Sequence, residues 1–292
     1  MTPTKRIAFV TYSEKPRLTD DDRLVLPHLA NRGITVLPAV WNDKTVPWSQ
    51  FDLVVLRSCW DYHHKPDEFR QFILELEHER IPLFNPAAVV KWNMDKHYLR
   101  DLSETGFRIA PTVWLEKNKS VNLREFMIAS HVEKAVIKPT IGAEGDGTWL
   151  TTLDTADDDQ SRFESALQQN DLMLQQFVGS VCELREWSLV FFNGKYSHSV
   201  LKKPKGSDFK IHGGSFESIT PSPLFLSEAQ SVIHCVPPCL YGRVDLVGDP
   251  GSQTMIMELE LIEPLLYLGT NERASENFSN AIADSLAAQS RR

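Results

Sequence analysis

The 292-residue chain has no hydrophobic run long enough to cross a bilayer, and it has only four cysteines, which are scattered. Cys235 and Cys239 are separated by three residues that include two prolines, a spacing that does not match a zinc knuckle. Residues 1–10 also lack the apolar core of a signal peptide. We therefore expect free thiols and a cytoplasmic location, where disulfides are rare.

The chain also has fewer positive than negative side chains. It contains 31 Lys and Arg against 39 Asp and Glu, which gives a formal net charge of −8. Such a balance disfavours a nucleic-acid or anionic-membrane surface, so we expect neither partner. The hydrophobic share of 42% and the charged share of 24% are typical of a soluble globular protein. The sequence leaves the oligomeric state open, a homo-oligomer included.

The first 90 residues alternate between strand-like and helix-like segments. The expected strands are 7–12, 34–40, 52–56 and one that begins at 83, and the expected helices are 20–33 and 67–80. This alternation predicts a parallel sheet, whose ligands bind at the carboxyl ends of the strands. Tyr12, Arg57, Ser58 and Asp61 are therefore candidate substrate contacts. The alternative is a loop whose arginine pairs with a local acid.

A glycine-rich loop, residues 141–148, follows a strand that ends near Lys138 and precedes another strand. Glycines such as Gly142 and Gly145 let backbone N–H groups wrap around phosphates. No Lys-Ser/Thr pair follows, so the loop is not a P-loop. Because a strand-end lysine precedes it, we interpret the loop as a phosphate site. The acidic run 157–159 is interpreted as a solvated loop before a helix at 161–169.

Asn193-Gly194 lies between two strand-like runs and predicts a β-hairpin. A basic segment follows it, and we interpret this segment as a cationic lid over an anionic substrate, with an exposed basic loop as the alternative. The candidate contacts in it are Lys203, Lys210 and Gly214. Further on, Ser227 is expected to begin a helix that reaches about residue 236. The histidines, among them His63 and His64, show no metal-binding spacing.

A second hairpin is predicted over residues 241–264, and its charges carry the chemistry. Arg243 and Asp245 are two residues apart on one arm, and Glu258 and Glu260 are two apart on the other, so each pair shares a face. Three carboxylates on one face repel one another unless a positive charge lies there. Oxygen ligands of this kind suit Mg²⁺. The alternative is a solvated strand face.

Seven short motifs, in this order along the chain, resemble the ATP-grasp superfamily of carboxylate–amine ligases, which includes D-alanine–D-alanine ligase and prokaryotic glutathione synthetase. They are Met94-Asp95-Lys96, Ile137-Lys138-Pro139, the glycine loop, Gln175-Gln176-Phe177-Val178, Glu186 before Ser188, Gly242-Arg243-Val244-Asp245 and Glu258-Leu259-Glu260. The runs 57–62, 197–200 and 258–264 are similar to the subgroup that contains a cycloserine-forming cyclo-ligase.

The resemblance implies an α/β ATP-grasp fold. Its parts would be an N-terminal parallel-sheet pre-ATP-grasp domain (residues 1–90), an α+β lid or central domain (91–180) and a C-terminal domain (181–292), with ATP between the last two. It also implies a role for each matching residue. Lys96, Lys138, Gly142 and Gly145 would hold ATP phosphates, Gln175, Phe177 and Val178 the adenine, and Glu186 the ribose; Asp245, Glu258 and Glu260 would bind two Mg²⁺, and Arg243 would stabilise the transition state.

The implied activity is an ATP-dependent ligase that activates a small carboxylate as an acyl phosphate for attack by an amine, between molecules or within one. A small-molecule kinase and a non-catalytic ATP-binding module are the alternatives. Two residues depart from the superfamily pattern. Glu260 stands where Asn is frequent, and Glu263-Pro264-Leu265 replaces a frequent Ser-Pro-Gly, so the acceptor pocket should differ from that of the peptide ligases.

Overall fold

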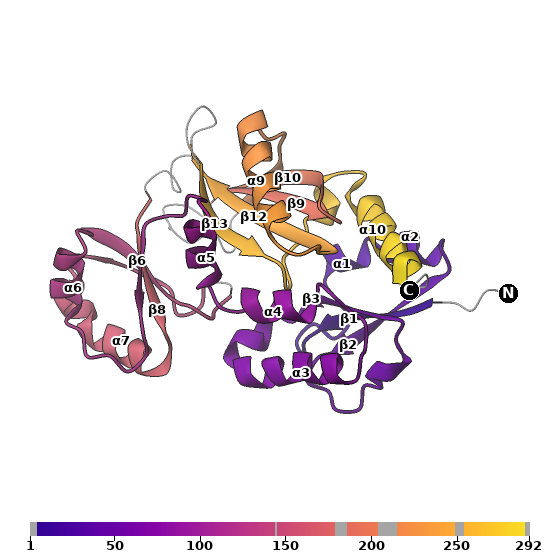
Figure 1. Ribbon diagram of the computed structural model, residues 1–292, viewed down its shortest axis with the longest axis horizontal. Coiled ribbons are helices and arrows are strands. Elements are labelled where there is room, and N and C mark those ends of the chain that lie inside the picture. Colours follow the sequence, from indigo (N-terminus) through magenta and orange to yellow (C-terminus); the bar gives the residue numbers. More distant parts are fainter. Residues whose placement is uncertain (1–4, 144, 179–185, 204–214, 249–253, 290–292) are drawn as a thin grey trace.

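The computed structural model describes residues 5–143, 145–178, 186–203, 215–248 and 254–289. Their strands form three sheets, each built from one continuous part of the chain (Figure 1). No helix of these residues is long and apolar enough to cross a membrane. The domain boundaries near residues 90 and 180 stay predictions.

The first sheet is parallel, with the strand order β2-β1-β3-β4. Its strands are β1 (Lys5–Thr11), β2 (Ile34–Val40), β3 (Leu53–Ser58) and β4 (Leu83–Phe84). Both faces are covered, because Ile7 and Phe9 pack in one hydrophobic core while Ala8 and Val10 pack in another. Helix α3 (Pro66–His78) covers one face with the apolar stripe that its sequence predicts.

The C-terminal helix α10 (Ala274–Gln289) covers the other face of this sheet, so the first strand and the last helix pack together (Figure 1). The helix expected over 20–33 is instead two short helices, α1 (Asp20–Arg23) and α2 (Leu26–Ala30). Pro27 lies in the first turn of α2, where the missing N–H of proline leaves no hydrogen bond unmade.

The second sheet is antiparallel, with the order β5-β8-β6-β7. Its strands are β5 (Thr112–Leu115), β6 (Lys134–Pro139), β7 (Trp149–Thr152) and β8 (Leu172–Gln176), packed on helices α6 (Leu123–Ala129) and α7 (Ala156–Gln169). The acidic run 157–159 is not a loop but the first turn of α7. Carboxylates are stabilising there because the helix N-terminus is positive. The chain reaches this sheet through α4 (Ala87–Asn93) and α5 (Tyr98–Glu104), whereas the short helices η1 (Trp48–Gln50) and η2 (Trp60–His64) lie on either side of β3.

The third sheet is antiparallel, with the order β11-β10-β9-β12-β13. Its strands are β9 (Glu186–Phe192), β10 (Lys195–Lys203), β11 (Ser215–Ser218), β12 (Tyr241–Val247) and β13 (Met255–Glu260). Both predicted hairpins are confirmed. Asn193 and Gly194 have positive φ, as a tight hairpin turn requires. Helix α9 (Pro223–Cys235) begins earlier than predicted, because Ser222 rather than Ser227 caps it.

Two buried asparagines join the α4 region to the third sheet. Asn85 donates to the carbonyls of Tyr241 and Leu261, and Asn93 donates to Leu259 O and accepts from Leu261 N. Each amide satisfies backbone groups on β12, on β13 or just after it that a side chain of another type would leave unpaired in the core. The hairpin of β12 and β13 is therefore held in place from outside its own sheet.

Arg57 makes a second connection of this kind. Its side chain is 1% exposed, donates through Nε to Asp22 Oδ1 at 2.8 Å, and donates through Nη2 to the carbonyl of Pro264 at 2.9 Å. Its guanidinium also lies 5.0 Å from the centre of the Tyr241 ring. Arg57 thus ties the end of β3 to the segment after β13, which contributes to the pocket described below.

This geometry predicts the effect of Arg57→Ala. The substitution leaves Asp22 as a buried charge without its partner, so the free energy of unfolding should fall by about 3–5 kcal/mol. Lys5→Ala is the matched control, because the Lys5–Asp52 pair is partly exposed and should contribute less than about 1 kcal/mol. Urea denaturation measures both, and equally small losses would contradict the anchoring role.

Candidate active site

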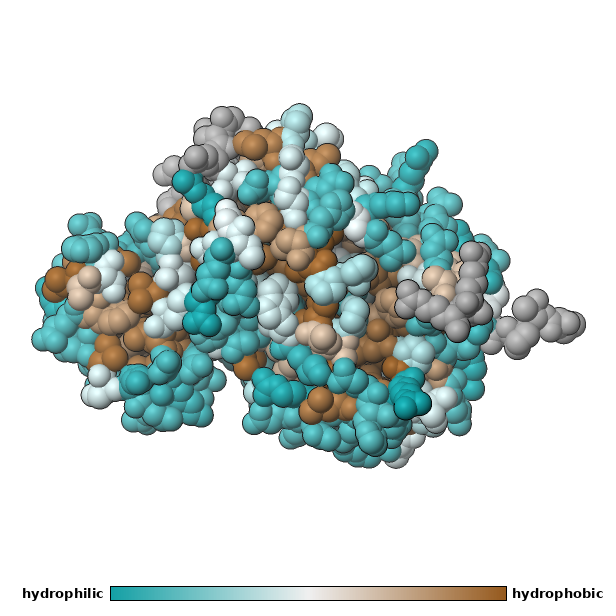
Figure 2. All heavy atoms as spheres, in the orientation of Figure 1, coloured by the Kyte–Doolittle hydropathy of each residue, from teal (hydrophilic) through white to brown (hydrophobic). Residues whose placement is uncertain are grey.

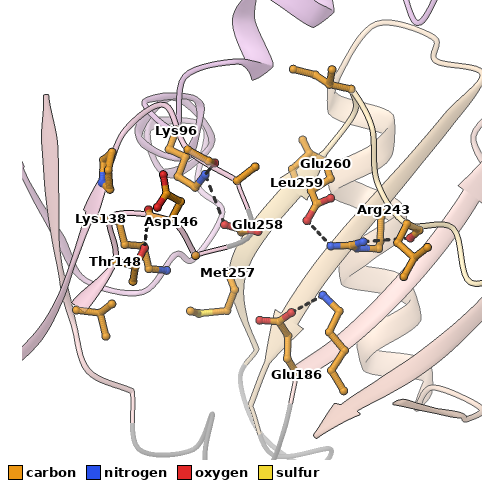
Figure 3. A pocket seen from close by; sticks show the side chains of 18 of the residues that line it. Lys96, Lys138, Asp146, Thr148, Glu186, Arg243, Met257, Glu258, Leu259 and Glu260 are labelled. Carbon is orange, nitrogen blue, oxygen red and sulfur yellow. Dashed lines mark hydrogen bonds and ion pairs between the residues drawn. The ribbon is translucent and has the colours of Figure 1, made fainter. Parts of the chain in front are cut away.

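A cavity of about 550 Å³ is lined by residues of the second and third sheets and of η2, and most of the predicted site residues are among them (Figure 3). In the space-filling view, a notch on the lower edge separates the lobe that carries α6 and α7 from the remainder (Figure 2). Of the predicted residues, those lining the cavity are Lys96, Lys138, Gly142, Gly145, Gln175, Phe177, Val178, Glu186, Arg243, Glu258 and Glu260.

The predicted carboxylate cluster is present on β12 and β13. The ladder pairs Arg243 with Glu260 and Asp245 with Glu258, so all four side chains share one face. Carboxylate oxygens of Asp245, Glu258 and Glu260 lie within 4.8 Å of one another. The sequence-based expectation that these acids converge is therefore confirmed, whereas their metal binding stays a prediction.

Asp245 is fully buried and bound on both oxygens. Its Oδ1 accepts from Arg243 Nε at 2.9 Å and from Ser188 Oγ at 2.6 Å; its Oδ2 accepts from Arg243 Nη2 at 3.0 Å and from Lys202 Nζ at 2.8 Å. Burial alone would raise the pKa of Asp245, but Arg243 and Lys202 outweigh it and hold that pKa well below its usual range. Asp245 is therefore a permanently ionised anchor for two cations.

Lys202 is a site residue that sequence reasoning missed. Its Nζ also donates to Glu186 Oε1 at 2.7 Å, so it bridges β9 and β12 from β10. Counting back from the Asn-Gly turn would pair Glu186 with residue 201, but a bulge between Tyr196 and His198 shifts the register so that Glu186 faces Lys202. That shift cannot be read from the turn alone.

Lys203, the predicted substrate contact, lies next along the strand and so points to the opposite face. It pairs with Glu217 at 2.7 Å and does not line the cavity, which corrects the prediction. Lys210 and Gly214 lie outside the described residues.

The pKa values of the two glutamates on β13 are shifted in opposite directions. Burial, together with the charges of Asp245 and Glu258, raises the pKa of Glu260 to about 7 against the opposing effect of Arg243, which contacts it. Burial also disfavours ionised Glu258, but Lys96 and Lys138 outweigh it and lower its pKa. A divalent cation bound between these carboxylates would offset their mutual repulsion.

Two lysines form the opposite wall of the cavity (Figure 3). Lys96 Nζ donates to the Gly142 carbonyl at 2.6 Å and lies 3.7 Å from Glu258 Oε1, while Lys138 Nζ donates to Gln175 Oε1 at 2.9 Å. Burial lowers the pKa of Lys138, as does the nearby Lys96, whereas Glu258 raises it. A polyphosphate bound here would neutralise the positive charges of the two adjacent lysines.

The N-terminal unit contributes Trp60 and Tyr62 to the cavity, and Trp60 Nε1 donates to the carbonyl of Glu263 at 3.1 Å. The predicted contacts on this unit do not line it. Ser58 is buried and donates to Thr11, and Asp61 accepts from Trp41 Nε1 at 2.7 Å. Tyr12 packs against Trp60, with ring centres 6.1 Å apart.

The structure also corrects the prediction that Arg57 contacts the substrate. Arg57 pairs with Asp22, the local acid of the alternative interpretation, and its 1% exposure is incompatible with direct substrate contact in this structure. Glu263, noted in the sequence only as a departure from a pattern, does line the cavity. Burial, and secondarily the charge of Glu260, raises the pKa of Glu263 to about 8.

Comparison with known proteins agrees with this geometry. Residues 7–85 match the family model described as the N-terminal domain of D-cycloserine synthetase DcsG. The cycloserine biosynthesis protein DcsG of Streptomyces lavendulae is 32% identical over 272 residues, which cover 87% of this chain and 90% of that protein. The chain belongs to the D-cycloserine synthetase family.

Membership in the D-cycloserine synthetase family makes the protein an ATP-grasp ligase with an α/β fold, as predicted. The crystal structure of D-cycloserine synthetase DcsG superposes with a TM-score of 0.87 and 28% identity, over 96% of this chain and 99% of that one. The D-alanine–D-alanine ligase of Bacillus anthracis, in complex with ATP, gives 0.70 and 16% over 97% and 98%, which shows the shared fold.

Lys138→Met tests the phosphate wall. Loss of one charge-assisted contact should cost about 1.5–3 kcal/mol of Mg²⁺–ATP binding, or roughly a 10- to 150-fold rise in Kd. The melting temperature should not fall, because burial already disfavours the Lys138 charge. Calorimetry measures both, with the exposed Lys119→Met as control. Unchanged ATP affinity would remove Lys138 from the site.

Proposed function

We propose that this ligase activates a small carboxylic acid as an acyl phosphate and closes a ring, by attack of a nitrogen of the same molecule on the activated carbonyl. One observation carries the proposal: the cavity places the Arg243 and Lys202 cations on one side, Lys96 and Lys138 on the other, and an acidic face between them. A relative that shares 32% identity is named for cycloserine biosynthesis, and cycloserine is a cyclic compound.

The residues present fit magnesium. Glu258 and Glu260 open into the cavity, and their oxygens converge with those of Asp245 within 4.8 Å, an oxygen-only donor set that Mg²⁺ prefers. When bound there, Mg²⁺ would neutralise phosphate charge and assist phosphoryl transfer. Asp245 contributes mainly by fixing Arg243 and Lys202, since both its oxygens already accept hydrogen bonds from these cations.

The side chains of the protein would promote the reaction by electrostatic stabilisation. Lys96 and Lys138 bind the phosphates, and the glycine loop lies beside them. Arg243, held by Asp245 and Glu260, supports the negative charge that develops on the transferring oxygens. The nucleotide base is assigned to Gln175, Phe177 and Val178, and the ribose to Glu186, whose carboxylate Lys202 orients. No nucleophilic side chain is required, since the substrate supplies both reacting groups.

The products distinguish this proposal from its alternatives. A ring-closing ligase releases ADP, inorganic phosphate and a cyclic product in equal amounts from one acid. A small-molecule kinase would release ADP and a phosphorylated product without free phosphate, and a binding module would release neither. Screening small amino- or ureido-bearing acids for ADP and phosphate, with mass spectrometry of the product, decides among them.

Glu258→Gln tests the acidic face. Turnover should fall by at least about 100-fold, because the proposed Mg²⁺ would lose a charged ligand at the point where phosphoryl charge develops. The unfolding free energy should change by less than about 1 kcal/mol, since Glu258 is held by a long 3.7 Å pair with Lys96. Mg²⁺–ATP should raise the melting temperature less in the variant than in the wild type.

Thermal shift with and without Mg²⁺–ATP measures this last effect, and the surface variant Glu75→Gln is the control. Equal shifts together with retained turnover in Glu258→Gln would mean that β12 and β13 present a charged surface without a catalytic role.

A further inference from the structure

A second cluster of potential metal ligands lies apart from the carboxylates of β12 and β13, and one of its members, Asp146, also lines the cavity. It comprises His63 and His64 at the end of η2, and Asp146 in the glycine loop between β6 and β7. His63 Nε2 lies 3.7 Å and His64 Nδ1 3.8 Å from the same oxygen, Asp146 Oδ2. The ligand atoms of all three residues lie within 4.8 Å of one another.

The hydrogen bond of His63 fixes which of its nitrogens carries a proton. Its Nδ1 lies 2.7 Å from the carbonyl oxygen of Trp60, and since a carbonyl can only accept, Nδ1 carries the proton. In the neutral ring, Nε2 then presents its lone pair toward the Asp146 carboxylate. A lone pair that faces a carboxylate is favourable only if a cation lies between them, either a proton on Nε2 or a metal ion.

Several features favour a metal ion. A metal-binding histidine characteristically donates its other ring N–H to a backbone carbonyl, as His63 does to Trp60. Donor atoms 3.7–3.8 Å apart can both lie about 2.1 Å from one ion. The side chains of His64 and Asp146 are 59% and 62% exposed, so they can adjust around an ion, whereas His63, at 6%, is held in place.

We propose that His63, His64 and Asp146 form a binding site for a transition-metal ion such as Zn²⁺, distinct from the magnesium face. The two sites differ in chemistry, because imidazole nitrogens suit Zn²⁺ whereas oxygen-only ligands suit Mg²⁺. Three protein ligands at a partly exposed position leave room for water as a fourth. The site joins two parts of the chain that are far apart in sequence, the end of η2 and the glycine loop.

This position gives the ion a consequence for the nucleotide site. Gly142, Gly145 and Asp146 line the cavity, so an ion that ties Asp146 to the N-terminal unit restrains the loop assigned to the phosphates. Bound Zn²⁺ should therefore slow the release of a fluorescent ADP analogue, and His64→Ala should abolish this slowing. This consequence rests on the proposed nucleotide site, whereas metal binding itself does not.

Titration of ZnCl₂ into the nucleotide-free protein tests the site directly by calorimetry. His64→Ala and Asp146→Asn should each weaken Zn²⁺ binding at least about tenfold, because each removes one of three ligands. His78→Ala removes an exposed histidine at the end of α3 and should leave the affinity unchanged. Glu258→Gln should also bind Zn²⁺ as the wild type does, since it alters only the magnesium face.

The outcomes separate the possibilities. Loss in His64→Ala and Asp146→Asn, with retention in His78→Ala and Glu258→Gln, supports the site even if the proposed ligase activity fails. Affinity unchanged in His64→Ala, or lost in Glu258→Gln, would place the ion elsewhere and overturn the proposal. No Zn²⁺ binding by the wild type would mean that a proton joins His63 to Asp146, and would overturn it as well.

Discussion

The buried carboxylate of Asp245 is the constraint on which the active-site region depends. It lies fully buried on β12, an inner strand of the third sheet, where an ionised group is costly unless it is paired, and it is paired with both Arg243 and Lys202. Those cations in turn hold Glu260 and Glu186. One buried charge thus positions side chains from β9, β10, β12 and β13.

Pairing with cations explains how four acidic side chains can lie close together: Glu186, Asp245, Glu258 and Glu260. Cations from the protein's own chain offset part of the repulsion, while Glu258 and Glu260 still line the cavity. The raised pKa of Glu260 and the lowered pKa of Lys138 mark where compensation is incomplete. Perturbed groups of opposite sign that face one cavity are characteristic of a site built for charged ligands.

The N-terminal unit supports this site from behind and does not itself present the predicted contacts. Arg57 and Asn85 of this unit, and Asn93 just after it, all donate to backbone carbonyls of β12, of β13 or of the segment after it. Only Trp60 and Tyr62 of this unit reach the cavity, among the residues up to 90 that the structure describes. Trp60 of this pair also donates to the carbonyl of Glu263, where the chain departs from the superfamily pattern.

The sequence by itself determined the elements whose signals are local. Hydrophobic periodicity predicted the parallel strands and α3, the Asn-Gly pair predicted its hairpin, and the spacing of Arg243, Asp245, Glu258 and Glu260 predicted a shared face. Tertiary structure decided what depends on register and on distant partners. A bulge places Lys202 rather than Lys203 in the site. Arg57 pairs with Asp22 and so does not reach the cavity. The placement of η2 beside the glycine loop puts His63 and His64 next to Asp146. Local sequence cannot specify these contacts, because each joins strands or loops whose relative placement is fixed only when the whole core packs.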